Sequence, residues 1–235
     1  HVVHSNSFGA SPVKLAERGL GERAVEINRR AAETACSVRP GGRFVAGDIG
    51  PTGKMLQPFG DLDPAAAEDA FRRQADALLA GGADLISIET MFSLEEALIA
   101  LRAAKSLGKV FVVASLTFNR SPRGFFTMMG DGVDTAVRAL EAAGADAIGS
   151  NCGLGSADMV ELAAALRAAT RLPILLQPNA GRPVVEDGRT VYRQSPSEFS
   201  ADALRIKTAG ADMIGGCCGT NPEFIRELAR AVGGQ

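Results

Sequence analysis

The sequence lacks tryptophan, and its 235 residues include only one tyrosine and four cysteines. Antibody-like sandwiches and aromatic nucleic-acid platforms depend on Trp and Tyr, so this composition argues against both classes of protein. Four cysteines are too few to staple a chain of this length with disulfides. We therefore expect a reducing compartment, and the cytoplasm is the expected location.

The sequence also lacks a long apolar run and an excess of either charge. No apolar stretch approaches the about 20 residues that a membrane-spanning helix needs. The 25 Lys and Arg residues are balanced by 27 Asp and Glu residues, and no Lys/Arg-rich run stands out. We predict neither a membrane nor nucleic acid as a partner.

What the sequence does have is a regular alternation of short apolar runs and helical patterns. The runs are β-branched or aliphatic and bounded by Gly, Pro or Asp, which is typical of strands buried on both faces of a parallel sheet. We expect strands at 2–3, 44–46, 85–88, 110–114, 147–149, 174–176 and 213–214. We expect helices at 64–80, from Ser93 onward, and at 134–143, 157–169, 196–208 and 222–232. Asp63 and Ser93 are N-cap residue types, and Glu96 stands at the capping-box spacing from Ser93.

An internal repeat gives this alternation a period. The motif Gly-Ala-Asp followed by two apolar residues occurs at 82–86, 144–148 and 210–214, so that each interval holds two strand–helix units. This spacing favours a (β/α)₈ barrel over an open sheet. Seven strands are visible, and we expect the first βα unit to precede His1. We therefore predict one domain, residues 1–235, that is an N-terminally truncated barrel.

Polar and special residues follow each predicted strand, where the active site of such a barrel lies. Three of the four cysteines, Cys152, Cys217 and Cys218, fall on this rim. Cys36 lies late in a helical pattern and is interpreted as a buried structural thiol. The strand ends that carry Cys152 and the Cys217-Cys218 pair have the same parity in the barrel, so their tips converge. Three thiolates at one point need a cation, and zinc suits them; a vicinal disulfide or inert buried thiols are the alternatives.

A zinc site of three thiolates would favour one reaction class. It carries a local charge of −1 and is a weak Lewis acid for water, but it binds an incoming thiol as a thiolate. A free alkyl thiol has a pKa of about 8.5 and is mostly protonated at pH 7. Thiol alkylation is therefore the natural chemistry of such a centre, and metal-assisted hydrolysis is less natural.

The order and spacing of six motifs resemble the homocysteine S-methyltransferase family over essentially the whole chain. Within that family the sequence is most similar to the homocysteine-binding module of cobalamin-dependent methionine synthase. The motifs are Asn6-Ser7-Phe8-Gly9-Ala10, the segment 47–53, Ile88-Glu89-Thr90-Met91, Asn151-Cys152-Gly153, the segment 177–181 and the segment 215–220.

The resemblance implies a role for each matching residue. It implies that the three rim cysteines bind catalytic zinc and that Asn179 can take the fourth position before substrate arrives. It implies that Glu89 and the backbone near Asn151 hold the amino-acid end of homocysteine, and we assign a catalytic role to both. We predict that Asn6 and Ser115, on the same rim, also contact substrate. Family members carry an Asp-Gly motif on the first barrel strand, which has no counterpart in this sequence.

The resemblance further implies methyl transfer to homocysteine, giving methionine. The segment 177–181 favours a methylated corrinoid as donor, and no cobalamin-binding Asp-x-His-x-x-Gly motif occurs in the sequence. We therefore expect the corrinoid on another domain or protein. A betaine- or sulfonium-dependent enzyme, or a zinc-stabilised binding module without activity, are the alternatives.

Four other features receive a structural interpretation. His1 and His4 are interpreted as structural residues, and Asp48 as a residue that shapes its loop. The segment 47–54 lacks the spacing and the Ser/Thr of a P-loop, which argues against a nucleotide site. The segment 120–126 is expected to be a solvated loop.

Overall fold

The computed structural model describes residues 1–233, which form two compact units. The first unit comprises His1–Ser115 and Ala139–Asp146, and the second comprises Leu116–Arg138 and the chain from Ala147 onward. Helix α5 (Val133–Ala142) contains the boundary between them. Each unit is an α/β structure, and each is described here by itself.

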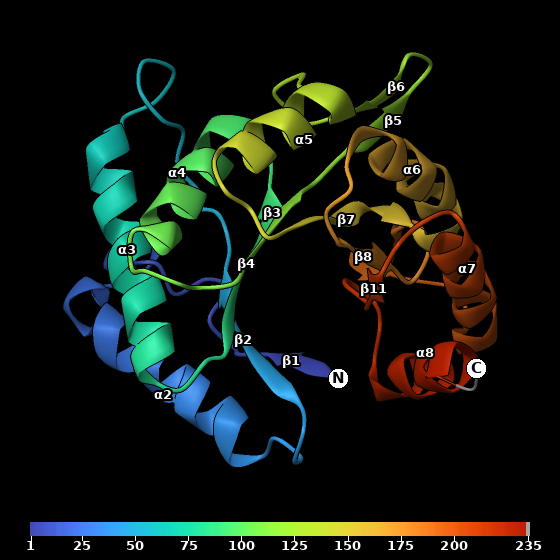
Figure 1. The fold of residues 1–235 in the computed structure, drawn as a ribbon, viewed down its shortest axis with the longest axis horizontal. Coiled ribbons are helices and arrows are strands. Elements are labelled where there is room, and N and C mark those ends of the chain that lie inside the picture. The colour runs from blue at the N-terminus through green and yellow to red at the C-terminus, as the bar shows by residue number, and fades with distance from the viewer. Residues whose placement is uncertain (234–235) are drawn as a thin grey trace. The chain divides into compact units, whose positions relative to one another are not determined.

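The first unit has parallel strands in the order β1-β2-β3-β4, with helices α2, α3 and α4 packed in sequence beside them (Figure 1). The strands are β1 (Val2–His4), β2 (Phe44–Ile49), β3 (Leu85–Met91) and β4 (Val112–Leu116). The helices are α1 (Pro12–Ala16), a 3₁₀ turn (Gly21–Arg23), α2 (Ala24–Ser37), α3 (Pro64–Ala80) and α4 (Leu94–Lys105). Phe71, Leu78, Ile86 and Leu101 are fully buried between the strands and helices, as expected for a sheet covered by helices.

The second unit has parallel strands in the order β7-β8-β11, with α6, α7 and α8 packed in sequence (Figure 1). Its main elements are β7 (Ala147–Gly155), α6 (Ser156–Ala169), β8 (Ile174–Asn179), α7 (Pro196–Thr208), β11 (Met213–Ile214) and α8 (Pro222–Gly233). Two antiparallel hairpins complete it: β5 (Asn119–Ser121) with β6 (Gly124–Phe126), and β9 (Val184–Glu186) with β10 (Arg189–Val191). The rings of Phe199 and Phe224 meet edge to face in its core, with centroids 5.5 Å apart.

The predicted alternation is confirmed at the level of α/β class, strands and helices. Each of the seven expected strands is present, and the strands pair in parallel within each unit. The helices at 64–80 and 196–208 have the predicted bounds. The segment 120–126, expected as a solvated loop, is instead mostly the β5–β6 hairpin. No helix among residues 1–233 is long and apolar enough to cross a membrane.

The helix starts follow from their capping residues, with one correction. Asp63 accepts hydrogen bonds from the first backbone N–H groups of α3, and Pro64 follows it, as predicted. Ser93 caps α4 by accepting from the N–H of Glu96. The Glu96 carboxylate, expected to complete a capping box, instead accepts from the backbone N–H and the hydroxyl of Thr52, at 2.8 and 2.6 Å. Glu96 thereby anchors the loop after β2 on α4.

The Gly-Ala-Asp repeat forms the same device three times. Each glycine has a positive φ, between 89° and 118°, which ends the helix before it. Each aspartate then makes two bonds with one residue of the neighbouring strand: its N–H donates to that residue's carbonyl, and its carboxylate accepts from that residue's N–H. The pairs are Asp84 with Val45, Asp146 with Val112, and Asp212 with Ile174.

We name this pair of bonds the aspartate clasp. A cation neutralises each carboxylate: Arg39 at Asp84, Lys105 at Asp146 and Arg167 at Asp212. The clasps lie where the strands begin and fix the register of adjacent strands. The sequence repeat therefore encodes strand alignment at the end of each sheet opposite to the predicted rim.

Candidate active site

Three cysteine side chains come together at the carboxyl ends of β7 and β11. Cys152 is on β7, and Cys217 and Cys218 follow β11 after two glycines, Gly215 and Gly216. The Cys218 sulfur is 3.9 Å from the sulfurs of both Cys152 and Cys217, and all three sulfurs lie within 4.8 Å of one another. We name these three residues the thiol cluster; the prediction that they converge is confirmed within the second unit.

The spacing of the sulfurs discriminates between the alternatives left open by the sequence. A disulfide would bring two sulfurs to about 2.05 Å, and none of the four cysteines forms a disulfide. A tetrahedral zinc ion with sulfur ligands at about 2.3 Å spaces them about 3.8 Å apart. The thiol cluster therefore fits zinc with only small adjustments, and three protein ligands would leave one position for a further ligand.

Strained backbone turns the cysteines toward each other. Cys152 has φ 59°, which is uncommon for a residue with a side chain, and the pairing of β7 with β8 shifts register between Asn151 and Gly155. Gly219 has φ 80°, and a Cβ on it would meet the Tyr192 ring at 2.3 Å. Only glycine therefore fits beside Cys218, because the Tyr192 ring packs directly on this backbone.

The thiols are electrostatically unequal. Hydrogen bonding from Cys217, from backbone and from Asn179 outweighs burial and lowers the pKa of Cys152 from 9.0 to about 5. Burial, together with the negative charge of Cys152, raises the pKa of Cys218. Without a cation Cys152 is therefore a thiolate near pH 7, and a second thiolate at Cys218 is disfavoured. A bound cation would remove that penalty.

Two asparagines support the thiol cluster. Asn151 is fully buried, and its side-chain N–H donates to the Cys217 sulfur at 3.8 Å. Asn179 is 3% exposed, and its side-chain oxygen accepts from the N–H of Cys218 at 3.1 Å. Both residues predicted for the site thus contact it. The oxygen of Asn179 that a metal would use is engaged with backbone here, and its role as fourth ligand stays a prediction.

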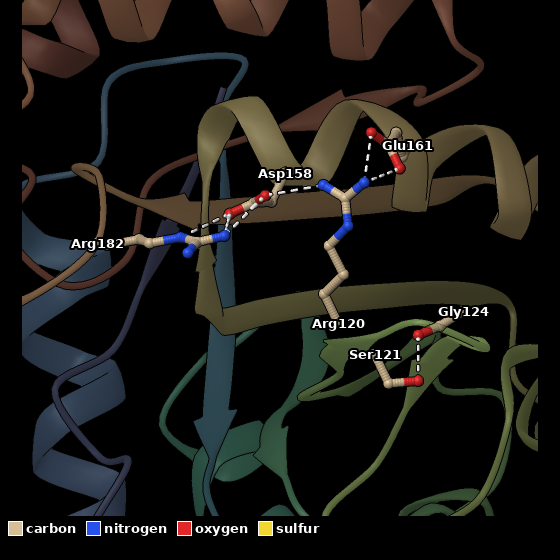
Figure 2. A network of polar contacts seen from close by, with 6 residues as sticks. All are labelled: Arg120, Ser121, Gly124, Asp158, Glu161 and Arg182. Atoms are coloured by element: carbon tan, nitrogen blue, oxygen red, sulfur yellow. Dashed lines mark hydrogen bonds and ion pairs between the residues drawn. The ribbon is translucent and has the colours of Figure 1, made fainter.

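An ion-pair network ties two loops of the second unit to α6 (Figure 2). Arg120 of the β5–β6 hairpin bonds Asp158 at 3.2 Å and Glu161 at 2.7 Å, both on α6. Arg182, three residues after Asn179, forms an ion pair with the same Asp158 carboxylate at 3.0 Å. The hairpin and the segment after β8 are therefore both tied to the helix that follows Cys152.

A second group of ligating side chains lies in the first unit, on three neighbouring strands. His4 pairs in register with Ala46, so Asp48 is two residues further on the same face of β2; likewise Asp48 pairs with Ser87, and Glu89 is two residues further on β3. The His4 Nδ1 atom is 4.0 Å from Asp48 Oδ2 and 3.9 Å from Glu89 Oε1. We name His4, Asp48 and Glu89 the carboxylate cluster.

The electrostatics of the carboxylate cluster are dominated by burial. Burial and the neighbouring Glu89 raise the pKa of Asp48 well above its usual value. Burial lowers the pKa of His4, although Glu89 opposes this shift. Sequence reasoning identified Glu89 but assigned His4 and Asp48 structural roles; the only signal for either residue was its place after a predicted strand.

The remaining predicted residues occupy different environments. The Ser115 hydroxyl, at the end of β4, is buried and has no hydrogen-bond partner among the described residues. Asn6 is exposed after β1. Cys36 is half-buried, and its thiol donates to the carbonyl of Gly82 at 3.2 Å, which agrees with a structural role.

Comparison with known proteins identifies the family of this chain. The family model described as homocysteine S-methyltransferase matches residues 1–232. Curated methionine synthases of Mycobacterium leprae and Mycobacterium tuberculosis are 32% and 34% identical over 98% of this chain. The chain spans 20% of the length of these two proteins.

Comparison with solved structures shows which fold the chain shares. The homocysteine methyltransferase MmuM from Escherichia coli, in its oxidized form, matches 97% of this chain and 78% of its own chain, with a TM-score of 0.74 and 24% identity. Its metallated form matches with a TM-score of 0.71. At this identity the likeness shows a common fold. By the match along residues 1–232, the chain belongs to the homocysteine S-methyltransferase family.

Proposed function

We propose that this protein transfers a methyl group to the sulfur of homocysteine and so forms methionine. The observation that carries the proposal is the thiol cluster, whose sulfur separations of 3.9 Å suit zinc, in a member of this family. When bound there, zinc would hold the substrate sulfur as a reactive thiolate near pH 7, where the free thiol is mostly protonated.

The chain's own residues would bind and orient the substrate. Glu89 would pair with its ammonium group, and Asn151, whose side chain bonds Cys217, would orient the site and present its backbone to the amino-acid end. Ser115 would also contact substrate, because its buried hydroxyl has no hydrogen-bond partner among residues 1–233 and is available to a ligand. Asn6 would contact substrate from the exposed segment after β1, and Asn179 would complete the metal site before substrate arrives.

We further propose that residues 1–235 act as one homocysteine-binding domain of (β/α)₈ barrel architecture. The parallel strands of each unit and the fold shared with MmuM support this proposal. The cytoplasm is the proposed location, since a site of reduced thiols needs a reducing compartment.

The proposed methyl donor is a methylated corrinoid carried by another domain or protein. Identity of 32–34% with methionine synthases supports this choice over a betaine or a sulfonium compound. The test supplies zinc-loaded protein and homocysteine with a methylated corrinoid, a betaine and S-methylmethionine in turn, and measures methionine. Cys217→Ser is the matched control.

The outcomes separate the candidates. Methionine formed from the corrinoid supports the proposal, and methionine formed only from a betaine or sulfonium donor contradicts the donor assignment. Homocysteine binding without methionine from any donor would indicate a zinc-stabilised binding module. Absence of homocysteine binding to zinc-loaded protein would overturn the proposed function as a whole.

A further inference from the structure

We propose that Tyr192 is a positioning residue of the thiol cluster, whose hydroxyl donates a hydrogen bond to the sulfur of Cys218 and fixes that sulfur where a metal ion would bind. The proposal deepens the proposed function and rests on it, because that function supplies the zinc ion. Tyr192 is the only tyrosine of the sequence, and it lies in the second unit together with all three cysteines of the thiol cluster.

The Tyr192 ring is anchored by two contacts. The residue directly follows β10 and packs against the hydrophobic cluster of the second unit, which consists of Ala180, Phe199, Ala203, Phe224 and Leu228. The ring also lies on Gly219, where an added Cβ would come within 2.3 Å of the Tyr192 Cγ atom. These contacts hold the ring beside the residue that follows Cys218.

The Tyr192 hydroxyl reaches the sulfur of Cys218. Burial and the charge of Cys218 raise the pKa of Tyr192, and a hydrogen bond with Cys218 raises it further. Burial also raises the pKa of Cys218, whereas the hydrogen bond with Tyr192 opposes that rise. A hydroxyl that donates to a sulfur has these two effects, because the bond stabilises the thiolate and is lost when the phenol ionises. The phenol therefore stays protonated near pH 7 and is the donor.

The backbone around Cys218 is tied to the segment that precedes Tyr192. The carbonyl of Cys218 accepts from the N–H of Ala180 at 2.9 Å, and its N–H donates to the side-chain oxygen of Asn179 at 3.1 Å. The carbonyl of Ala180 in turn accepts from the N–H of Gln194, two residues after Tyr192, at 3.3 Å. With the bond from Tyr192, the N–H, the carbonyl and the sulfur of Cys218 each have a partner before a metal arrives.

A donor at Cys218 suits the chemistry of the thiol cluster. Cys218 is exposed, whereas Cys152 and Cys217 are half-buried, so it is the sulfur that most needs a fixed partner. Three thiolates around one divalent cation leave a local charge of −1, and a hydrogen bond to one of them disperses part of that charge. Partners of this kind orient the ligands of a metal and tune its electronic properties. Tyr192 would therefore affect how the metal is held, without touching the metal itself.

The test replaces zinc with Co²⁺, whose absorption spectrum reports on its sulfur ligands. Tyr192→Phe keeps the ring on Gly219 and removes only the hydroxyl. The sulfur-to-cobalt charge-transfer band should move to longer wavelength, because a sulfur without a donor releases an electron more readily. Competition with a chelator should show about tenfold weaker zinc binding, as for other partners of metal ligands. Ser200→Ala removes a hydroxyl that donates to the Ser197 carbonyl within α7; it is the matched control and should change neither property.

A second replacement leaves the phenol in place. Because Tyr192 is the only tyrosine, growth on 3-fluorotyrosine changes this position alone. The fluorinated phenol is more acidic and donates more strongly, so the band should move to shorter wavelength. A residue that only packed against Gly219 would not give opposite shifts in the two proteins.

Each contrary outcome has a distinct meaning. A band that stays in place in both proteins, or moves in the same direction in both, would overturn the positioning role of Tyr192 and leave the proposed function standing. A wild type that binds neither cobalt nor zinc would overturn the metal site and the proposed function with it. If Tyr192→Phe fails to fold by thermal melting, the comparison of fluorinated with unlabelled protein decides alone.

Discussion

The thiol cluster and the carboxylate cluster share a backbone feature but differ in their chemistry. Both lie at the carboxyl ends of parallel strands, and each contains or adjoins a non-glycine residue with positive φ, Cys152 at 59° and Thr90 at 57°. They differ in donor atoms and in exposure, since Cys218 is exposed and Asp48 is buried. Soft sulfur donors suit zinc, and the hard acceptors suit an ammonium or another hard cation. The fold supplies the position, and the side chains decide the ligand.

The largest expected effect is removal of the metal from one cluster alone. Cys217→Ala should lose zinc and methyl transfer, because two thiolates bind the ion far less tightly than three. The variant should keep most of its structure, because the thiol cluster caps a core that it does not create. Metal analysis and circular dichroism give the two readouts. Full zinc, about one ion per chain, in a triple alanine variant of the cluster would contradict the metal assignment.

The next effect separates the roles of the two clusters during binding. Homocysteine binding to zinc-loaded protein should release about one proton near pH 7 from the substrate thiol. Glu89→Gln should bind about tenfold to a hundredfold more weakly and still release that proton, because it keeps the metal. Calorimetry in buffers of different ionisation enthalpy counts the protons.

Two controls sharpen that count. Any proton that leaves Asp48 adds to the total, so Asp48→Asn reports the contribution of the thiol alone. Replacing Cys152 should abolish both binding and release. If zinc-loaded Asp48→Asn binds homocysteine without releasing a proton, sulfur activation is contradicted.

A smaller effect is expected at the opposite end of the strands. Asp84→Ala removes one aspartate clasp and leaves the N–H of Val45 and the guanidinium of Arg39 without their partner. The expected loss is about 1–3 kcal/mol in the free energy of unfolding, with zinc content unchanged. Denaturant unfolding measures the loss, and Asp69→Ala on the surface of α3 should cost less than about 0.5 kcal/mol. Loss of zinc together with stability would show that this clasp of the first unit also affects the metal site of the second unit.

The smallest effect is a pH dependence confined to the metal-free protein. The pKa of Cys152 falls from 9.0 to about 5 on folding, so its thiolate favours the folded state. This contribution is complete above pH 9, declines as the pH falls, and is absent below pH 5. The ultraviolet absorbance of the thiolate should titrate near pH 5 after chelation, and Cys152→Ser should lose that step. Titration only near pH 9 would contradict the inequality of the thiols.

The sequence predicted the elements whose signals are local. Apolar runs bounded by Gly, Pro or Asp marked the strands, and Asp63-Pro64 marked the start of α3. The β5–β6 and β9–β10 hairpins went unpredicted because each strand has three residues and little burial. The Glu96 carboxylate was assigned to its own helix, but the tertiary contact with Thr52 prevailed.

The candidate site, too, could be predicted from the sequence only in part. The cysteines could be predicted to converge because they follow strands and adjoin glycines. The carboxylate cluster could not, because it depends on the register of three strands, and a shift of one residue would turn His4 or Asp48 to the other face. The positive φ of Thr90 likewise has no signature in the residue type.

The aspartate clasp has a consequence for how this protein can be altered. The clasp joins Asp84, directly before β3, to Val45 of β2, and the carboxylate-cluster residues Asp48 and Glu89 follow three and five residues further along these strands. Different residues therefore determine how the strands align and which ligand binds. Protein design could replace the residues that follow the strands in order to bind another ligand. The turns before the strands would stay unchanged. The same separation would let natural variants explore new substrates without first losing the fold.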